Sequence, residues 1–429
     1  MDKARTLAPR DPQIAFLYAQ IRYERGYPAS RLFAHALALA PGNRDALRNL
    51  ALAEASEGRM AQAQNRLERA LAQAPDWLEG QRILASLRHT GGAARDEDAG
   101  YRAALTRLPA HPGLWLGLFA CVAQHRDWSR ARAILDEATR NLGETKNLLA
   151  ARLFLAGETG DMAASEALLA RAGALNDAFV QMARLRHHLR RGAYGDALAI
   201  ALPLLSGGNA GQVWPYVSSL WRLTGDARAA WLDGDPPHVG TYEPGLSAAE
   251  LAELAKALRR LHVAHLPYAE QSVRHGTQTD RSVLLRHEPI FEQTRAKLMA
   301  SVREHVRALP APDPDHPLLG RPRDALSLAG SWSVRLGAGG HNVTHSHPMG
   351  WLSSAFYVSL PDPSVMGAPP AGHLHLGAPP SELGLPLAPY ATLEPKAGHL
   401  VLFASTMWHG TTPIDAGERL NIAFDIVPR

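Results

Sequence analysis

Cysteine is almost absent from this sequence, since Cys121 is the single one among 429 residues. One cysteine cannot form an internal disulfide, and its apolar surroundings, LWLGLFACVA, favour a buried, inert thiol over a nucleophile. No run of about 18 uninterrupted apolar residues occurs, so we expect no membrane span. The first residues, MDKARTLAPRDPQ, lack the apolar core and the cleavage site of a secretory signal. We therefore expect a cytoplasmic protein.

Motifs of several enzyme classes are also missing. There is no convincing glycine-rich phosphate loop, CxxC pair or serine nucleophile elbow, which argues against kinase, thiol-redox and hydrolase chemistry. The formal charge of +4 is small for this length, and the arginines are scattered without interleaved aromatic residues. Nucleic-acid binding is therefore not supported. The high content of alanine and arginine is typical of GC-rich bacterial genomes.

What the first half does have is a repeat with a period of 34 residues. Proline ends successive units at positions 41, 75 and 109, and a glycine takes the fourth place at 143. Within the units a small residue recurs, followed by a bulky one: Ala29, Ala63 and Ala131, then Phe33, Leu67, Tyr101 and Leu135. The third unit departs from this pattern because Glu97 stands where the first alanine belongs, so we expect an irregular turn there.

This spacing resembles that of tetratricopeptide (TPR) repeats and extends over about residues 8 to 232, with weaker copies in its second half. Each unit is expected to be a helical hairpin that buries its apolar face against its neighbours and contributes to a concave groove. Such grooves bind peptides, so the expected partner is a peptide or protein. The alternatives are a rigid spacer or a dimerisation surface, and the sequence leaves the oligomeric state open.

The composition changes after residue 232. Residues 233–245, DGDPPHVGTYEPG, are predicted to be a linker, and amphipathic helices are expected over residues 246–265 and 281–309. Beyond residue 328 short runs alternate apolar and polar residues between glycine, proline and aspartate, as the strands of a barrel or jelly roll do. We therefore predict two domains, helical repeats over 1–232 and a second domain over 233–429, with its linker and helices at 233–325 and its strands at 326–429.

Three of the 20 histidines are spaced as metal ligands would be. His345 and His347 are two residues apart, so on an extended strand both side chains leave the same face. His409 follows the apolar run HLVLF, and the intervening short strands can bring it back to the first pair. Arg419 and Asn421, on the following strand, share one face and could bind a carboxylate.

The motifs WSVRLGAGGHNVTHSHPMGWLSSAFYV, EPKAGHLVLFASTMWHGTTP and GERLNIAFD resemble a family of bacterial 2-oxoglutarate/Fe(II) oxygenases, whose members often carry TPR repeats before the catalytic domain. The resemblance covers about residues 265 to 428. It implies a TPR solenoid followed by a double-stranded β-helix (jelly roll), with Fe(II), 2-oxoglutarate and O2 as cofactor and co-substrates. It also implies that His345, His347 and His409 bind the metal and that Arg419 anchors 2-oxoglutarate. In the similar prolyl hydroxylases the first motif is His-x-Asp, so His347 stands where an aspartate is usual.

Further residues have two interpretations. Tyr357 and Ser354 are candidate ligands of 2-oxoglutarate, although a tyrosine in AFYVSL could equally be a core residue. His373 and His375 could join the metal site, but exposed strand histidines are the simpler interpretation, and the same holds for His341. Trp332, Trp351 and Trp408 are expected to pack around the mouth of the barrel.

These observations predict a 2-oxoglutarate-dependent dioxygenase that hydroxylates a peptide or protein side chain recruited by the TPR repeats. One alternative is a non-catalytic TPR scaffold whose jelly roll keeps a structural metal. Another is a three-histidine dioxygenase that does not use 2-oxoglutarate. The substrate, the oxidised atom and the native metal are not determined by the sequence.

Overall fold

The structure of this chain is a computed structural model, and it describes residues 6, 8–92, 96–173, 175–267 and 271–429. The first residues of the predicted repeat domain, 1–5 and 7, lie outside this description. The chain forms two compact units, of which the first comprises residues 1–155, 263–271 and 285–287, and the second residues 156–262, 272–284 and 288–429. The predicted domain boundary at residue 232 falls inside the second unit and stays a prediction.

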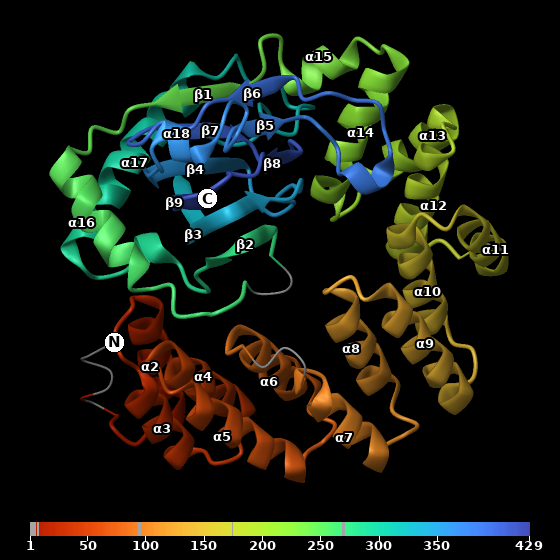
Figure 1. The fold of residues 1–429 in the computed structure, drawn as a ribbon, viewed down its shortest axis with the longest axis vertical. Helices are drawn as coiled ribbons and strands as arrows, with labels where there is room; N and C mark the ends of the chain where they lie inside the picture. The colour runs from red at the N-terminus through yellow and green to blue at the C-terminus, as the bar shows by residue number, and fades with distance from the viewer. Residues whose placement is uncertain (1–5, 7, 93–95, 174, 268–270) are drawn as a thin grey trace. The chain divides into compact units, whose positions relative to one another are not determined.

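The first unit consists of helical hairpins (Figure 1). The small and bulky residues that repeat every 34 positions are buried where consecutive helices pack, as Ala63, Leu67 and Leu135 illustrate with no exposed surface. The 34-residue period of the sequence thus identifies residues that form the core between the helices. The helices are α2 (Pro12–Glu24), α3 (Ser30–Leu39), α4 (Arg44–Ser56), α5 (Met60–Gln73), α6 (Leu78–Thr90), α7 (Ala99–Arg107), α8 (Pro112–Ala123), α9 (Trp128–Leu142) and α10 (Lys146–Thr159), the last of which crosses into the second unit.

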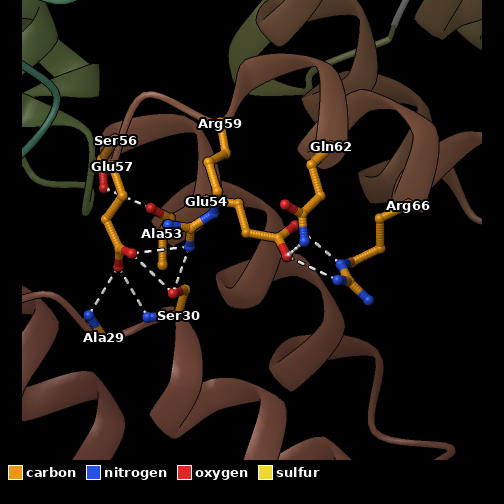
Figure 2. A network of polar contacts seen from close by, with 9 residues as sticks. All are labelled: Ala29, Ser30, Ala53, Glu54, Ser56, Glu57, Arg59, Gln62 and Arg66. Atoms are coloured by element: carbon orange, nitrogen blue, oxygen red, sulfur yellow. Dashed lines mark hydrogen bonds and ion pairs between the residues drawn. The ribbon is translucent and has the colours of Figure 1, made fainter.

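A polar network joins the turn between α4 and α5 to the turn between α2 and α3, as Figure 2 shows. Helix α3 has Ala29 at its N-cap, which supplies no side-chain acceptor. Glu57, just after α4, supplies it instead: its Oε1 accepts from the backbone N–H groups of Ala29 and Ser30, both at 2.9 Å, and its Oε2 accepts from the Ser30 hydroxyl at 2.8 Å. Arg59 donates to the same carboxylate at 2.8 Å. The otherwise unsatisfied donors at the start of α3 are therefore capped from the next helix.

The second unit begins with helices that continue the weaker repeats and ends with two β-sheets. The helices are α11 (Met162–Ala172), α12 (Ala178–Arg190), α13 (Tyr194–Leu204), α14 (Ala210–Thr224) and α15 (Arg228–Asp233). Their shared core includes Leu185, Val217, Leu220 and Trp221. None of the helices in the described part of the chain is long and apolar enough to cross a membrane.

The larger sheet is antiparallel and has the strand order β1-β7-β4-β9-β3-β2, and the smaller sheet has the order β6-β5-β8 (Figure 1). The strands are β1 (Val239–Tyr242), β2 (Val273–Gln278), β3 (Leu326–Asn342), β4 (Leu352–Ser359), β5 (Leu374–Leu376), β6 (Ala391–Leu393), β7 (Leu400–Ala404), β8 (His409–Thr411) and β9 (Arg419–Pro428). Short helices lie between them at η2 (Val283–Leu285), α18 (Pro363–Met366) and η3 (Ser381–Leu383).

Two helices, α16 (Ala248–Arg259) and α17 (Pro289–Ala308), pack on the larger sheet. Leu258 of α16 and Val302 of α17 share one core with Phe356 of β4 and Phe424 of β9. Because side chains alternate along a strand, the residues between these apolar ones face the other way. That second face carries the polar side chains of the candidate site.

The predicted fold class is confirmed: helical hairpins precede an antiparallel two-sheet domain. Two local predictions differ from the structure. The segment predicted as a linker contains β1, which pairs with β7 at the edge of the sheet; four residues with a glycine gave no strand pattern. The helix expected over 281–309 begins only at Pro289, which occupies its first turn, where the missing N–H of proline costs nothing.

Candidate metal centre

The three predicted histidines lie together, His345 and His347 on the segment between β3 and β4 and His409 on β8. His409 is the first residue of β8, and its backbone N–H and C=O each form a 2.9 Å hydrogen bond with the backbone of His345. The backbone N–H of His347 donates to Ser405 at 3.0 Å. One ring nitrogen from each histidine lies within 4.8 Å of the other two. Backbone pairing between segments far apart in the sequence thus brings three imidazoles to one point.

Hydrogen bonds fix which nitrogen each imidazole turns towards the others. The Nδ1 atom of His345 lies 2.8 Å from the carbonyl oxygen of Val343, and that of His409 lies 3.0 Å from the carbonyl oxygen of Met407. Since a carbonyl oxygen only accepts, Nδ1 carries the proton in both rings and Nε2 keeps its lone pair. Burial lowers the pKa of His345 to about 3 and that of His409 well below its ordinary value. Both rings are therefore neutral, as metal ligands must be.

The third histidine is held by a carboxylate that the sequence analysis missed. Nδ1 of His347 lies 2.7 and 2.9 Å from the two carboxylate oxygens of Asp425 on β9. Asp425 also accepts from the Ser353 hydroxyl at 2.7 Å, and Ser353 and Ser405 are hydrogen-bonded to each other at 2.9 Å. Asp425 could have been predicted to lie near the site, because on an extended strand its side chain leaves the same face as those of Arg419 and Asn421. The three histidines, with every Nδ1 oriented by an oxygen, fit a divalent metal ion.

A second group of predicted residues, Arg419, Asn421 and Tyr357, lies on the same face of the larger sheet. Tyr357 of β4 is paired with Asn421 of β9, and the guanidinium carbon of Arg419 lies 5.0 Å from the centre of the Tyr357 ring. Arg419 is 1 % exposed, donates to the Gly372 carbonyl at 2.8 Å and has no carboxylate within ion-pair distance among the described residues. In that same part of the chain no partner is found for the Arg419 Nε, Tyr357 hydroxyl or Asn421 Oδ1 atoms.

A buried guanidinium without an anion is costly, since the desolvated charge is uncompensated. Burial accordingly lowers the pKa of Arg419 and raises that of Tyr357. Two of these atoms, Arg419 Nε and the Tyr357 hydroxyl, are donors, and an anionic, oxygen-rich ligand would satisfy both. These residues thus fit a dicarboxylate such as 2-oxoglutarate.

Ser354, the fourth predicted ligand of the co-substrate, lies differently. Its hydroxyl donates to the backbone carbonyl of Phe424 and accepts from the backbone N–H of Phe424, both at 2.9 Å. Three positions before Tyr357 on an extended strand, it faces the opposite side of the sheet. Its neighbour Ser353 is the serine on the metal face.

Two of the other predicted histidines and Trp332 lie near the cluster, whereas Trp351 is buried in the core shared with α16 and α17. His375 of β5 lies near its edge, with Nε2 3.3 Å from the Thr344 hydroxyl, and His373 turns its Nδ1 towards the Ala371 carbonyl at 3.2 Å. Neither belongs to the group of nitrogens that could share one metal. The Trp332 ring packs against His347 with centroids 5.4 Å apart, and Phe403 packs against His409 at 4.8 Å. Aromatic side chains therefore shield two of the three imidazoles from water.

Helix α14, from the repeat-like part of the second unit, contacts both loops that carry the histidines. The rings of Tyr216 and Trp408 are perpendicular, with centroids 5.3 Å apart, and Trp408 directly precedes His409. Gly211 lies so close to the loop after His347 that an added Cβ would be 2.2 Å from the Pro348 carbonyl oxygen. The sequence gave no indication of these contacts.

Comparisons with known proteins agree with this geometry. Residues 330–425 match the family described as "Putative 2OG-Fe(II) oxygenase". The comparison with curated proteins finds no match.

Among solved structures, a viral collagen prolyl hydroxylase from Paramecium Bursaria Chlorella virus-1 is 13% identical, covering 45% of this chain and 97% of its own, with a TM-score of 0.30. A Pseudomonas putida prolyl-4-hydroxylase is 18% identical, covering 45% and 93%, with a TM-score of 0.30. A tetratricopeptide repeat protein from Parabacteroides merdae is 15% identical, covering 58% and 98%, with a TM-score of 0.37. Likenesses this partial do not assign a function.

The matched range contains the residues that build the site. It runs from within β3 to within β9 and includes the three histidines, Arg419 and Asn421. Iron(II) as the metal and 2-oxoglutarate as the co-substrate agree with the three converging imidazoles and the buried, unpaired guanidinium. The C-terminal strands of this chain, residues 330–425, are thus similar to the 2OG-Fe(II) oxygenase family, and helical hairpins with a 34-residue sequence period precede them.

Proposed function

We propose that the protein is a 2-oxoglutarate-dependent hydroxylase of a peptide or protein side chain, with His345, His347 and His409 as the iron ligands. The observation that carries this proposal is the buried Arg419, whose charge has no carboxylate partner among the described residues, next to three imidazoles that converge on one point. Iron bound there supplies the oxidation of the substrate by O2, coupled to the conversion of 2-oxoglutarate to succinate and CO2.

The residues of this chain would bind and orient the reactants. Arg419 would pair with the distal carboxylate of 2-oxoglutarate, and the Tyr357 hydroxyl would donate to it, which gives partners to two of the buried atoms that lack them. Asn421 would orient the same group through its amide. Asp425 would hold the His347 ring in the tautomer that leaves Nε2 free. Trp332 and Phe403 would exclude water from the imidazoles.

The helices of the second unit support the proposal of a peptide substrate. A cavity of about 520 Å³ lies among α12, α13 and α14, and it is lined by apolar side chains together with Arg186, Asn209 and Gln212. This volume is within the range of sites that hold small ligands or side chains, about 300–1,000 Å³. Tyr216 lines the cavity and contacts Trp408, the residue before His409, so one side chain lies between the cavity and the metal centre.

A cytoplasmic location and a bacterial source remain predictions.

The test is an anaerobic titration of the metal-free chain with Fe(II) and then with 2-oxoglutarate, following the visible absorption band of the chelated oxo acid. The band should form with the wild type, and succinate should appear when O2 is admitted. Arg419→Met should weaken 2-oxoglutarate binding by about 30-fold or more, since removing one partner of a buried ion pair costs about 2 kcal/mol or more. Arg321→Met, at an exposed arginine, is the control.

Other results would select the alternatives. Iron bound at the three histidines without a band would favour a three-histidine dioxygenase that does not use 2-oxoglutarate. No metal binding at the three histidines would favour a scaffold. Equal 2-oxoglutarate affinities of the wild type and Arg419→Met would refute the role of Arg419. Recruitment by the helices is tested by filling the cavity with Gly208→Trp, where an added side chain has open space, and this should reduce the capture of peptides from a synthetic array without changing Fe(II) affinity.

A further inference from the structure

A second cluster of metal-ligating side chains lies in the first unit, in the repeat whose sequence departs from the pattern. His89 is at the end of α6, Glu97 precedes α7, and His125 follows α8. Nδ1 of His89 is 3.0 Å from one oxygen of Glu97, and Nε2 of His125 is 2.8 Å from the other. The two imidazole centroids are 4.5 Å apart, and the three candidate ligand atoms lie within 4.8 Å of one another.

The contacts of His89 require a cation between its Nδ1 atom and Glu97. Its Nε2 lies 3.1 Å from the backbone carbonyl oxygen of Pro267, which can only accept, so Nε2 is the donor. If the imidazole is neutral, Nδ1 then carries a lone pair instead of a proton. This lone pair faces an oxygen of Glu97, which is also an acceptor. Two acceptors at 3.0 Å repel each other unless a cation lies between them. That cation is either a second proton on His89 or a metal ion.

Glu97 has the properties of a metal-binding carboxylate. Its residue is 6 % exposed, and the described residues offer it no lysine or arginine partner. Each of its two carboxylate oxygens faces one imidazole nitrogen, at 3.0 Å for His89 and 2.8 Å for His125. The neighbouring Asp98 is different, because Arg102 and Arg130 both pair with it. The buried charge of Glu97 is thus balanced only by what the two imidazoles hold.

The buried Cys121 thiol does not belong to the group of atoms in the described residues that could share this metal ion. Two imidazoles and one carboxylate form a donor set typical of zinc, and a metal-bound histidine usually donates its other N–H to an oxygen, as His89 does to Pro267.

We infer that His89, Glu97 and His125 form a second metal site, for Zn²⁺ or a divalent ion of similar ligand preference, separate from the three-histidine centre. The glutamate at position 97 replaces the small residue of the regular repeat, so the metal would take over the role of close packing in this turn. It would hold the ends of α6 and α8 together and fix the ring that also binds the Pro267 carbonyl. This inference does not depend on the proposed oxygenase activity.

The experiment is equilibrium dialysis of the full chain against Zn²⁺, followed by elemental analysis. The wild type should bind two zinc ions per chain, and His347→Ala/His409→Ala should retain one. Adding Glu97→Gln, which keeps the shape of the side chain, should weaken the retained site at least tenfold, and His125→Ala should do the same. His35→Ala, at an exposed histidine of the same unit, should have no effect.

A second measurement needs no change in the first unit. Co²⁺ added to the His347→Ala/His409→Ala chain should give the intense visible bands of a four-coordinate site. Absence of these bands together with absence of bound zinc would overturn the inference and leave a protonated His89 paired with Glu97. Unchanged zinc binding in the Glu97→Gln chain would also overturn it, by placing the ion elsewhere.

Discussion

Replacing Asp425 by asparagine should weaken metal binding at the three-histidine centre although Asp425 is not itself a proposed ligand. Its carboxylate accepts the Nδ1 proton of His347 at 2.7 Å, and that bond leaves Nε2 free to bind. A carboxamide of the same shape can donate its N–H to Nδ1 instead, which favours the tautomer with the proton on Nε2. It also removes the negative charge beside the imidazole, which favours a bound cation. Losses of this kind are about 10- to 100-fold in affinity, or about 1.4 to 2.7 kcal/mol.

The affinity can be measured by anaerobic calorimetric titration with Fe(II). The Glu97→Gln background restricts the measurement to the three-histidine centre. Asp324→Asn, at an exposed aspartate, is the matched control and should bind as the parent does. Asp425→Glu should recover part of the affinity because it keeps the charge. If Asp425→Asn binds Fe(II) as tightly as Asp324→Asn, then the carboxylate does not set the tautomer of His347, and the reasoning is wrong.

Three further predictions concern helix capping, pH and close packing. Glu57→Ala removes the cap of α3 and should lower the free energy of unfolding by about 1–2 kcal/mol, whereas Glu57→Gln, which keeps an acceptor, should lose less in urea titrations. Burial raises the pKa of Asp233 to about 6 from 3.8, so the folded state holds its proton more tightly than the unfolded state. The contribution of this group to the free energy of unfolding is then lost as pH rises from about 4 to about 6, by up to ~3 kcal/mol, and Asp233→Asn should not show that loss. If the free energies of unfolding of the wild type and the variant differed by the same amount at every pH, this prediction would be contradicted. Gly211→Ala forces α14 away from Pro348 and should lower Fe(II) affinity, while Gly208→Ala, with open space around it, should not.

Much of the fold could be predicted because it depends on local periodicity. The 34-residue spacing marked residues such as Leu67 and Phe33 that are fully buried between helices. Alternation in the last third of the chain marked the strands, and it placed Arg419 and Asn421 on one face. What alternation could not mark was a strand as short as β1, where four residues carry too little pattern.

The candidate site was only partly accessible from the sequence. His345, His347 and His409 were found because two of them share a strand face and a short apolar run precedes the third. Asp425 was missed although its position along β9 puts it on the same face as Arg419 and Asn421. Alternation along a strand predicts the face on which a side chain lies, but it does not predict which residue of the neighbouring strand lies opposite. The pairing of β9 with β4, which places Asp425 opposite Ser353 and near His347, is a long-range register. Ser354 differs from Tyr357 in strand parity, so the alternation along β4 already places these two predicted ligands on opposite faces.

The amino-acid sequence by itself thus determined the repeat period, the strand faces and the order of the three histidines. Each of these depends on residues a few positions apart, whose geometry along a helix or strand is fixed by the backbone. Only the tertiary structure decided that Asp425 holds His347, that α14 contacts both histidine loops, and that Glu97 lies between His89 and His125. These contacts join residues distant along the chain, and they form only when strands pair and helices stack, so no local spacing encodes them.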